Sequence, residues 1–250
     1  MMREDAAAQA AQEGVRGPVV VQHVSVPVAP GGVVATTTLS AETGCPELVQ
    51  QIVALGAGGD WQATVVGGGQ CWYVAEGRVS VYGDARFPVE SGMGVFIPPG
   101  GRYRIVNEGT TSAQVVAVSL PAPAAGDQPV VAALEDCPVE RTGDREFRVL
   151  LGPHCGVRTA TQFVGDIPPG RAPEHAHPYD EVVRVLHGEG RVHAGGEVHA
   201  LRAGTCVYLP PHVPHCLENA SLGPMRVLGV FHPGESPAAK VPLPAATASP

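Results

Sequence analysis

Hydrophobic residues in this chain come in short, valine-rich runs that alternate with polar residues. In a strand, successive side chains point to opposite faces, and β-branched residues suit that geometry. Only residues 46–56 (PELVQQIVALG) also have helical spacing, but Gln51-Ile52-Val53 resembles Gln162-Phe163-Val164 later in the chain, which favours a strand. The sequence therefore predicts an all-β protein. The clearest runs are residues 19–28, 78–83, 114–120, 181–186 and 225–231.

The second half of the chain repeats the first. Residues 92–107 (GMGVFIPPGGRYRIVN) align without a gap with residues 204–219 (GTCVYLPPHVPHCLEN), 112 positions later. Upstream, AEGRV at 75–79 matches GEGRV at 188–192. A match of this length indicates an internal duplication of one strand-turn-strand unit. We therefore expect two tandem β-domains.

Composition sets the expected boundaries of these domains. A Pro/Ala/Gly-rich stretch separates the copies and is typical of a linker, and both ends of the chain are poor in core-forming residues. The predicted order is a disordered N-terminus (1–17), a first domain (18–120), a linker (121–144), a second domain (145–233) and a disordered tail (234–250).

Charge and cysteine content narrow the class of protein. The net charge is −8, and Lys240 is the only lysine, so no basic stripe suggests a nucleic-acid partner. No apolar run reaches the length of a membrane span, and residues 1–14 lack the apolar segment of a signal peptide. Without these segments we expect a cytoplasmic location. The six cysteines form no CxxC pair, so we expect reduced thiols.

Four residues of the second copy have the spacing of a metal site. His175 and His177 are two apart, so they share a strand face. A turn at 178–180 leads to Glu181, and antiparallel pairing across that turn returns its carboxylate toward the imidazoles. His215 follows a proline-stiffened loop, which holds its ring at low entropic cost. Three imidazoles and a carboxylate suit one divalent transition metal ion, with Fe or Mn favoured and Ni, Co, Cu or Zn possible.

These two runs resemble the paired motifs of the cupin superfamily, and the repeat makes the chain similar to a bicupin. The first motif of the family is matched by Gly170, His175, His177, Glu181 and Gly188, and the second by Gly204, Pro210, His215 and Asn219. His212 stands where the family usually has glycine. The resemblance implies two tandem double-stranded β-helix (jelly-roll) barrels, with metal ligands His175, His177, Glu181 and His215.

The first copy lacks these ligands. The repeat offsets place Gln62, Thr64 and Gly68 opposite the first three ligands and Tyr103 opposite His215, which is no set for a transition metal. We expect a structural role for this domain, with a non-metal pocket around Gln62, Arg102 and Tyr103 as the alternative.

Further residues are candidates for catalysis or substrate binding. Besides Glu181, the acid/base candidates are Glu174, if a bulge turns it inward, and Tyr179 at the mouth of the site. Gln162 and Arg158 precede the motif and would meet a polar or anionic substrate from inside the barrel, and His212 would line the pocket from the ligand loop.

Three classes of function remain open, because one fold hosts many chemistries. The leading hypothesis is a dioxygenase acting on a small enolic, phenolic or oxo-acid substrate, since the ligand set resembles that of quercetinase-like bicupins. Glu181 argues against a gentisate dioxygenase type, and the single site argues against an oxalate decarboxylase type. The alternatives are a non-redox isomerase, epimerase or lyase, and a binding or sensing protein without turnover. We expect a homodimer.

Overall fold

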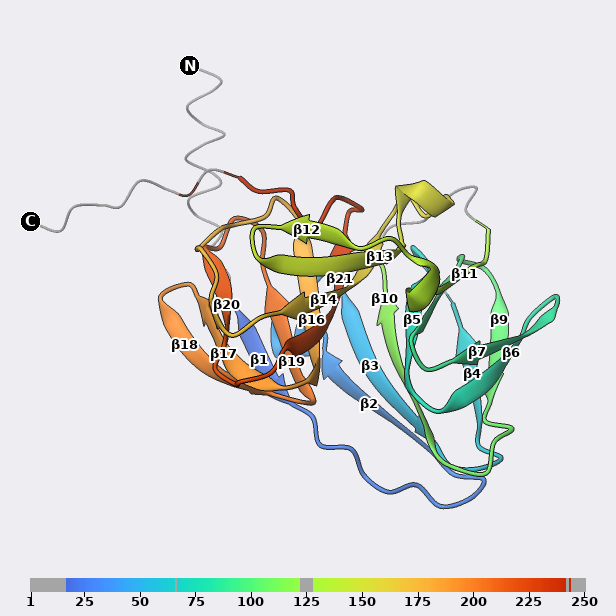
Figure 1. Cartoon of the computed structure of the whole chain (residues 1–250). Helices are drawn as coiled ribbons and strands as arrows, with labels where there is room; N and C mark the ends of the chain where they lie inside the picture. Colours follow the sequence, from blue (N-terminus) through green and yellow to red (C-terminus); the bar gives the residue numbers. More distant parts are fainter. Residues whose placement is uncertain (1–16, 66, 122–127, 242, 244–250) are drawn as a thin grey trace, which may run out of the picture.

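The computed structural model describes residues 17–65, 67–121, 128–241 and 243, and it shows two β-barrels side by side (Figure 1). Residues 1–16, 242 and 244–250, which belong to the predicted disordered ends, lie outside the described residues. In the described part of the chain the helices are three-residue 3-10 turns, so none is long enough to cross a membrane.

The N-terminal barrel is built from a six-stranded and a four-stranded sheet. The segment with ambiguous spacing at 46–56 is a strand, as expected, because it pairs on both sides within the larger sheet. In spatial order the larger sheet contains β11 (Val130–Ala133), β8 (Met93–Ile97), β5 (Gln70–Glu76), β10 (Ala113–Ser119), β3 (Val49–Leu55) and β2 (Val33–Leu39). The smaller contains β4 (Asp60–Thr64), β9 (Arg102–Val106), β6 (Arg78–Tyr82) and β7 (Arg86–Glu90), and the turn η1 is Ala41–Thr43.

The C-terminal barrel repeats this plan, which confirms the predicted all-β fold with two tandem barrels. Its larger sheet contains β1 (Val19–Gln22), β19 (Thr205–Leu209), β16 (Asp180–His187), β21 (Met225–His232), β14 (Thr161–Ile167), β13 (Arg145–Leu151) and β12 (Glu140–Thr142). Its smaller sheet contains β15 (Gly170–Arg171), β20 (His215–Asn219), β17 (Glu189–Ala194) and β18 (Glu197–Arg202), and the turns are η2 (Leu134–Asp136) and η3 (Pro153–Cys155).

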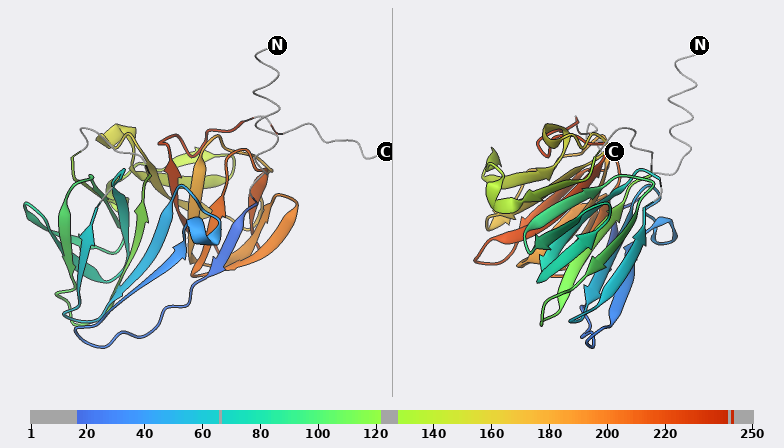
Figure 2. Two further views of the ribbon diagram at one scale, coloured as in Figure 1. Left: turned by 180° about the vertical axis from the view of Figure 1, so that it is seen from behind. Right: turned by 90° about the vertical axis from the view of Figure 1, so that its right-hand side faces the viewer.

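The two barrels exchange a strand with one another. β1 leaves the N-terminal half to pair with β19, as the blue strand beside orange ones in Figure 2 shows, and β11 pairs with the equivalent edge strand β8. Each exchange covers backbone groups of an edge strand that would otherwise stay unpaired. The stretch 121–144, predicted as a linker, therefore contains β11, η2 and β12 in its described part.

The larger sheets of the two barrels pack against each other and share one core. That core includes Ile52, Phe96 and Val116 from the first barrel and Val182 and Leu228 from the second, all at most 2% exposed. Because side chains alternate, a strand such as β16 faces this shared core with one set of residues and its own barrel interior with the other. The residues of β16 that point into the second barrel are therefore separate from the shared core and can contribute to a functional site.

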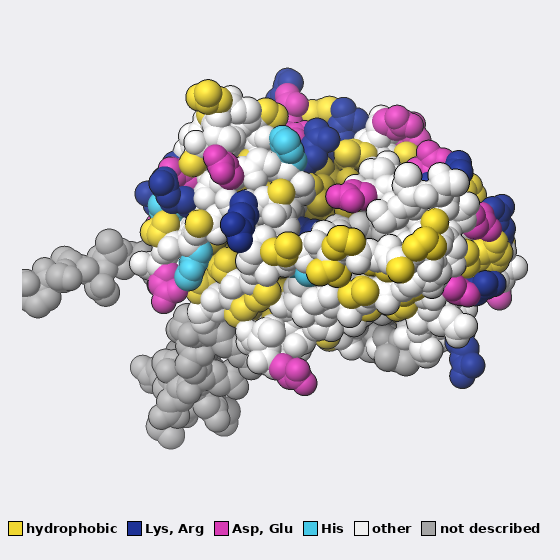
Figure 3. Space-filling view, turned by 90° about the horizontal axis from the view of Figure 1, so that it is seen from below, with side chains coloured by type: hydrophobic (Ala, Val, Ile, Leu, Met, Phe, Trp, Pro, Cys, Tyr) yellow, Lys and Arg dark blue, Asp and Glu magenta, His cyan; other side chains and the backbone are white. Residues whose placement is uncertain are grey.

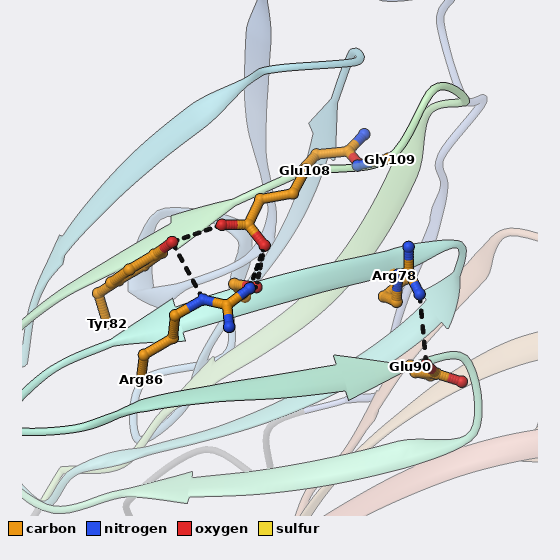
Figure 4. A network of polar contacts seen from close by, with 8 residues as sticks. Arg78, Tyr82, Arg86, Glu90, Glu108 and Gly109 are labelled. Atoms are coloured by element: carbon orange, nitrogen blue, oxygen red, sulfur yellow. Dashed lines mark hydrogen bonds and ion pairs between the residues drawn. The ribbon is translucent and has the colours of Figure 1, made fainter.

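Exposed polar contacts tie strands of the N-terminal barrel together at its surface. Glu108 accepts hydrogen bonds from Ser80, Tyr82 and Arg86, and Arg78 lies 3.9 Å from Glu90 (Figure 4). Such exposed pairs contribute little stability. On the face drawn in Figure 3, acidic and basic side chains are interspersed, and neither sign forms a continuous stripe there.

Candidate metal centre

Backbone pairing positions three of the four candidate ligands. His175 and His215 are direct partners across an antiparallel bridge, with reciprocal N–H to O=C bonds of 2.9 and 2.8 Å. His177 lies two residues further along the same segment, and its carbonyl oxygen accepts the His212 N–H at 2.7 Å. His212 has φ +63°, the left-handed conformation that usually favours glycine, so this non-glycine residue is held in a strained backbone conformation. Glu181 follows near the start of β16.

The three imidazoles converge on one point inside the C-terminal barrel, and the Glu181 carboxylate lies beside one of them. The three imidazole centroids are 4.6–5.0 Å apart, and one ring nitrogen of each lies within 4.8 Å of the others. The Glu181 Oε2 atom lies 3.6 Å from His177 Nε2. His177, Glu181 and His215 are 2–5% exposed. These spacings suit three imidazole donors around one ion, with the Glu181 carboxylate next to His177.

Hydrogen bonds orient each imidazole toward that point. His175 Nδ1 faces the Pro173 carbonyl oxygen at 3.1 Å, His177 Nδ1 faces that of Ala239 at 2.7 Å, and His215 Nδ1 faces that of Val213 at 2.8 Å. A carbonyl only accepts, so each Nδ1 carries the proton and each Nε2 keeps a free lone pair. This is the arrangement that metal-binding histidines require.

The electrostatics of the cluster also suit a cation. Burial lowers the pKa of His177 to about 4 and that of His215 to about 3, and it lowers the pKa of His175, so the rings are neutral. Burial raises the pKa of Glu181 to about 8, and its Oε2 atom is buried without a hydrogen-bond partner in the described chain. A buried acceptor without a partner is costly. A divalent ion would satisfy that oxygen, so the residues fit the predicted metal.

The ligands open onto a small cavity of about 160 Å³. Its walls are largely apolar, and the Phe163 and Phe231 rings meet there at a centroid distance of 4.9 Å. Arg145 and Lys240 also line it. Arg145 donates to the Leu217 carbonyl oxygen at 2.6 Å, and burial lowers its pKa. The cavity therefore combines apolar walls with two cations, which the sequence analysis did not identify because neither residue lies in the motifs.

The segment 234–241 packs over this site, which corrects the prediction of a disordered tail for these residues. It supplies the Ala239 carbonyl that orients His177, and Val241 forms a bridge with Ala176. Pro237 and Lys240 from the same segment line the cavity. Its composition is poor in core formers, but backbone groups make the contacts with His177 and Ala176, and composition carries no signal for those.

The two additional acid/base candidates do not line the cavity. Tyr179 is 1% exposed, and its hydroxyl lies 3.0 Å from His177 Nδ1 and donates to the Ser236 carbonyl oxygen at 3.1 Å. It therefore supports a ligand from behind. Glu174 is exposed, because no bulge turns it inward.

The three substrate-binding candidates lie elsewhere too. Gln162 is fully buried between the barrels, where its side chain donates to the Trp72 carbonyl oxygen at 3.3 Å. The neighbouring Phe163 takes the inward position, so the predicted facing of this strand was wrong by one residue. Arg158 and His212 are exposed and do not line the cavity.

Strand pairing also corrects the equivalent positions in the first barrel. Tyr103 faces Ala63 as His215 faces His175, and Val65 accepts the Gly100 N–H as His177 accepts that of His212. Gln70 pairs with Ile97 as Glu181 pairs with Leu209. The equivalents are therefore Ala63, Val65, Gln70 and Tyr103, whereas the predicted Gln62 and Thr64 are exposed. These corrected positions also contain no set of metal ligands, so the conclusion that the first barrel lacks a metal site is unchanged.

Comparisons with known proteins agree with this architecture. The family model described as "Cupin domain" matches residues 53–119 and 163–231, which together exceed half of the chain. No curated protein matches the sequence.

Among solved structures, the chain is similar in fold to Ylba from E. coli, with TM-score 0.71, 15% identity, and 92% and 96% of the two chains covered. It is similar to a "Cupin 2 conserved barrel domain protein" from Leptotrichia buccalis, with TM-score 0.59, 17% identity, and 83% and 92% covered. It is also similar to an oxalate decarboxylase of Bacillus subtilis, with TM-score 0.73, 14% identity, and 92% and 80% covered. These matches bear on fold.

Proposed function

This chain belongs to the cupin family, and we propose that its C-terminal barrel is a single-metal dioxygenase acting on a small substrate that carries a carboxylate, such as an enolisable oxo-acid. The observation that carries the proposal is the cluster of His175, His177 and His215, with the buried Glu181 beside His177. It lies at the end of a small, mostly apolar cavity that is also lined by Arg145 and Lys240.

The lining of the cavity favours chemistry at the ion over proton transfer by side chains. Glu146 and Asp166 are ion-paired with arginines, and Asp144 and Lys240 are exposed. In the described chain, the titratable side chains that line the cavity are these four residues, Arg145 and the candidate metal ligands. A redox-active divalent ion such as Fe or Mn, when bound, would polarise a substrate oxygen and exchange electrons with dioxygen.

The protein's own residues would select and orient the substrate. The Arg145 guanidinium, half-buried beside the ligands, would pair with a substrate carboxylate, and Lys240 would add a second positive charge. Phe163 and Phe231 would exclude water from the reacting end. The oxalate decarboxylase neighbour is named for a small dicarboxylate, which supports the proposed size and charge of the substrate.

Oxygen uptake tests the proposal. The protein is purified without oxygen, its metal is measured, and oxygen consumption is followed with 2-oxo acids, enolic diketones and phenolic acids. We expect uptake with a carboxylate-bearing member, loss of uptake in Arg145→Gln through a raised KM, and no change in Gln62→Ala. Zinc occupancy without oxygen consumption would contradict a dioxygenase. Release of carbon dioxide without oxygen uptake would instead identify a lyase.

A further inference from the structure

A second cavity, of about 720 Å³, lies between the two barrels and is separate from the metal centre. The two cavities share no lining residue. Strand β16 separates them, because Glu181 and Val183 face the barrel interior while Val182 and Arg184 face the neighbouring barrel. Arg184 lines the second cavity and is 4% exposed.

The charge of Arg184 has no counter-ion in the described chain. Its guanidinium donates to Gln114 Oε1 at 3.0 Å, to the Gly204 carbonyl oxygen at 3.4 Å and to Cys206 Sγ at 3.5 Å. All three acceptors are uncharged, and none of the ion pairs among the described residues includes Arg184. A buried charge without a partner is costly, and an anion would offset that cost.

The other groups that line the cavity leave it positively charged. Arg202 is exposed and outside the ion pairs of the described chain, Arg226 is held by Asp166, and Glu76 is the one carboxylate among the lining residues. The two arginines without an ion-pair partner, Arg184 and Arg202, therefore outnumber the single carboxylate of Glu76, and the lining has a net positive charge. His23 also lines the cavity, and its Nδ1 atom is buried without a hydrogen-bond partner in the described chain. Burial and then the Arg184 charge lower the pKa of His23, so a neutral imidazole faces the space.

The repeat shows that this charge belongs to one barrel. Tyr73 and Arg184 occupy equivalent positions, since Tyr73 pairs with Val116 and Arg184 pairs with Leu228. Gln114 and Arg226 are likewise the second residues of the equivalent strands β10 and β21. The cavity thus lies where the related halves meet, with Tyr73, Gln114 and the carboxylate Glu76 from the first barrel and the arginines from the second. One N–H of the Gln114 amide donates to Ser25 Oγ at 2.8 Å, which leaves its other N–H for a ligand.

We propose that this inter-barrel cavity binds a small oxyanion, a carboxylate or phosphate group, held by Arg184, Gln114 and His23. Arg184 is already held by two backbone or thiol acceptors and one amide, so its planar guanidinium is pre-organised for an oxyanion. The Tyr73 side chain, which lines the same space, offers a hydroxyl donor.

Titration with inorganic phosphate and, separately, with malonate tests the site. The full chain is used after metal removal by chelation, so that the metal centre does not take up the anion, and binding is measured by calorimetry and by thermal shift. We expect saturable binding, with at least a tenfold loss of affinity in Arg184→Gln. The phosphate and malonate arms distinguish which oxyanion the cavity prefers.

Gln114→Glu gives a second test that does not remove the buried arginine. The new carboxylate is nearly isosteric and lies within reach of Arg184, so it would act as an internal anion; we expect a folded protein that no longer binds phosphate or malonate. Arg78→Gln, on the exposed surface of the first barrel, is the matched control and should bind as the wild type does. Absence of saturable binding up to about 10 mM, or equal binding by the wild type and Gln114→Glu, would overturn the proposal.

Discussion

The two barrels share one backbone plan but use their interiors differently. Where the C-terminal barrel pairs His175 with His215, the N-terminal barrel pairs Ala63 with Tyr103. The first barrel then fills its interior, because the Trp72 ring lies 6.0 Å from Trp61 and 6.2 Å from Tyr103. The difference shows that a few inward positions decide whether this scaffold holds a packed core or a cavity with ligands.

The two barrels also differ in whether a buried polar side chain has hydrogen-bond partners. Gln70 Nε2 donates to Ser119 Oγ at 2.8 Å, and Gln70 Oε1 accepts from Trp72 Nε1 at 2.7 Å. At the equivalent position, Glu181 Oε2 has no partner in the described chain. The first barrel satisfies its buried polar group internally, whereas the second leaves it for a ligand.

Removing one of the metal ligands should have the largest effect on the difference between the two barrels. We expect about one ion per chain in the wild type, and loss of the ion in His175→Ala because three donors remain where the site supplies four. Gln62→Ala, on the exposed face of the corresponding strand, should keep the ion. Elemental analysis after gel filtration measures both. Two ions per chain, or an ion retained in His175→Ala, would contradict a single site.

Replacing Glu181 by glutamine, the residue at the equivalent position of the N-terminal barrel, should change how the stability of the metal-free protein depends on pH. Burial raises the pKa of Glu181 to about 8 from 4.5, so its neutral form stabilises the fold below pH 4.5 and that contribution is lost as pH rises through about 8. The full loss is on the order of 5 kcal/mol. Glu181→Gln copies Gln70 and should remove it.

The measurement is chemical unfolding of both chelated proteins between pH 5 and pH 8. The three histidines, whose pKa values are lowered, lose their contribution in the other direction, as pH falls below 6.5. They are common to both proteins, so the difference between the two unfolding curves isolates Glu181. A difference that does not vary with pH would show that the carboxyl is not buried as described.

The first barrel should depend on its filled interior for stability and not for metal binding. Trp72→Ala should lower the free energy of unfolding by about 3–5 kcal/mol, because it removes a large buried ring and leaves Gln70 Oε1 without its donor. The ion content should stay at that of the wild type. Denaturant unfolding and metal analysis check the two halves of this prediction. Loss of the ion in folded Trp72→Ala would mean that the first barrel controls the second.

The sequence predicts the site where chemistry and spacing coincide. His175, His177, Glu181 and His215 can be identified because ligand residue types recur at strand and turn spacing. Facing is harder to infer within a buried strand, where both sides are apolar: Gln162 and Phe163 differ by one position, and the prediction turned the wrong one inward. The repeat offset was also wrong by one residue for this segment, so the prediction named Gln62 and Thr64 where strand pairing places Ala63 and Val65 opposite the ligands.

Contacts between distant segments leave even less trace in the sequence. The exchange of β1 and β11 depends on which edge strands are open in the folded molecule, and runs of valine alone do not indicate it. The packing of 234–241 rests on carbonyl groups that every residue has. Backbone-mediated contacts of this kind become visible only when the fold is known.

Removing the hydroxyl of Tyr179 should give the smallest of these effects. That hydroxyl contacts His177 Nδ1 and the Ser236 carbonyl, so Tyr179→Phe loosens one imidazole and the segment over the site. Loss of such a supporting bond typically weakens metal binding 10- to 100-fold. Competition with a chelator of known affinity measures the change. Tyr82→Phe, which removes an exposed hydroxyl from the first barrel, is the matched control and should leave the affinity unchanged. Equal affinities in the two variants would show that Tyr179 only packs, and that the carbonyl of Ala239 alone orients His177.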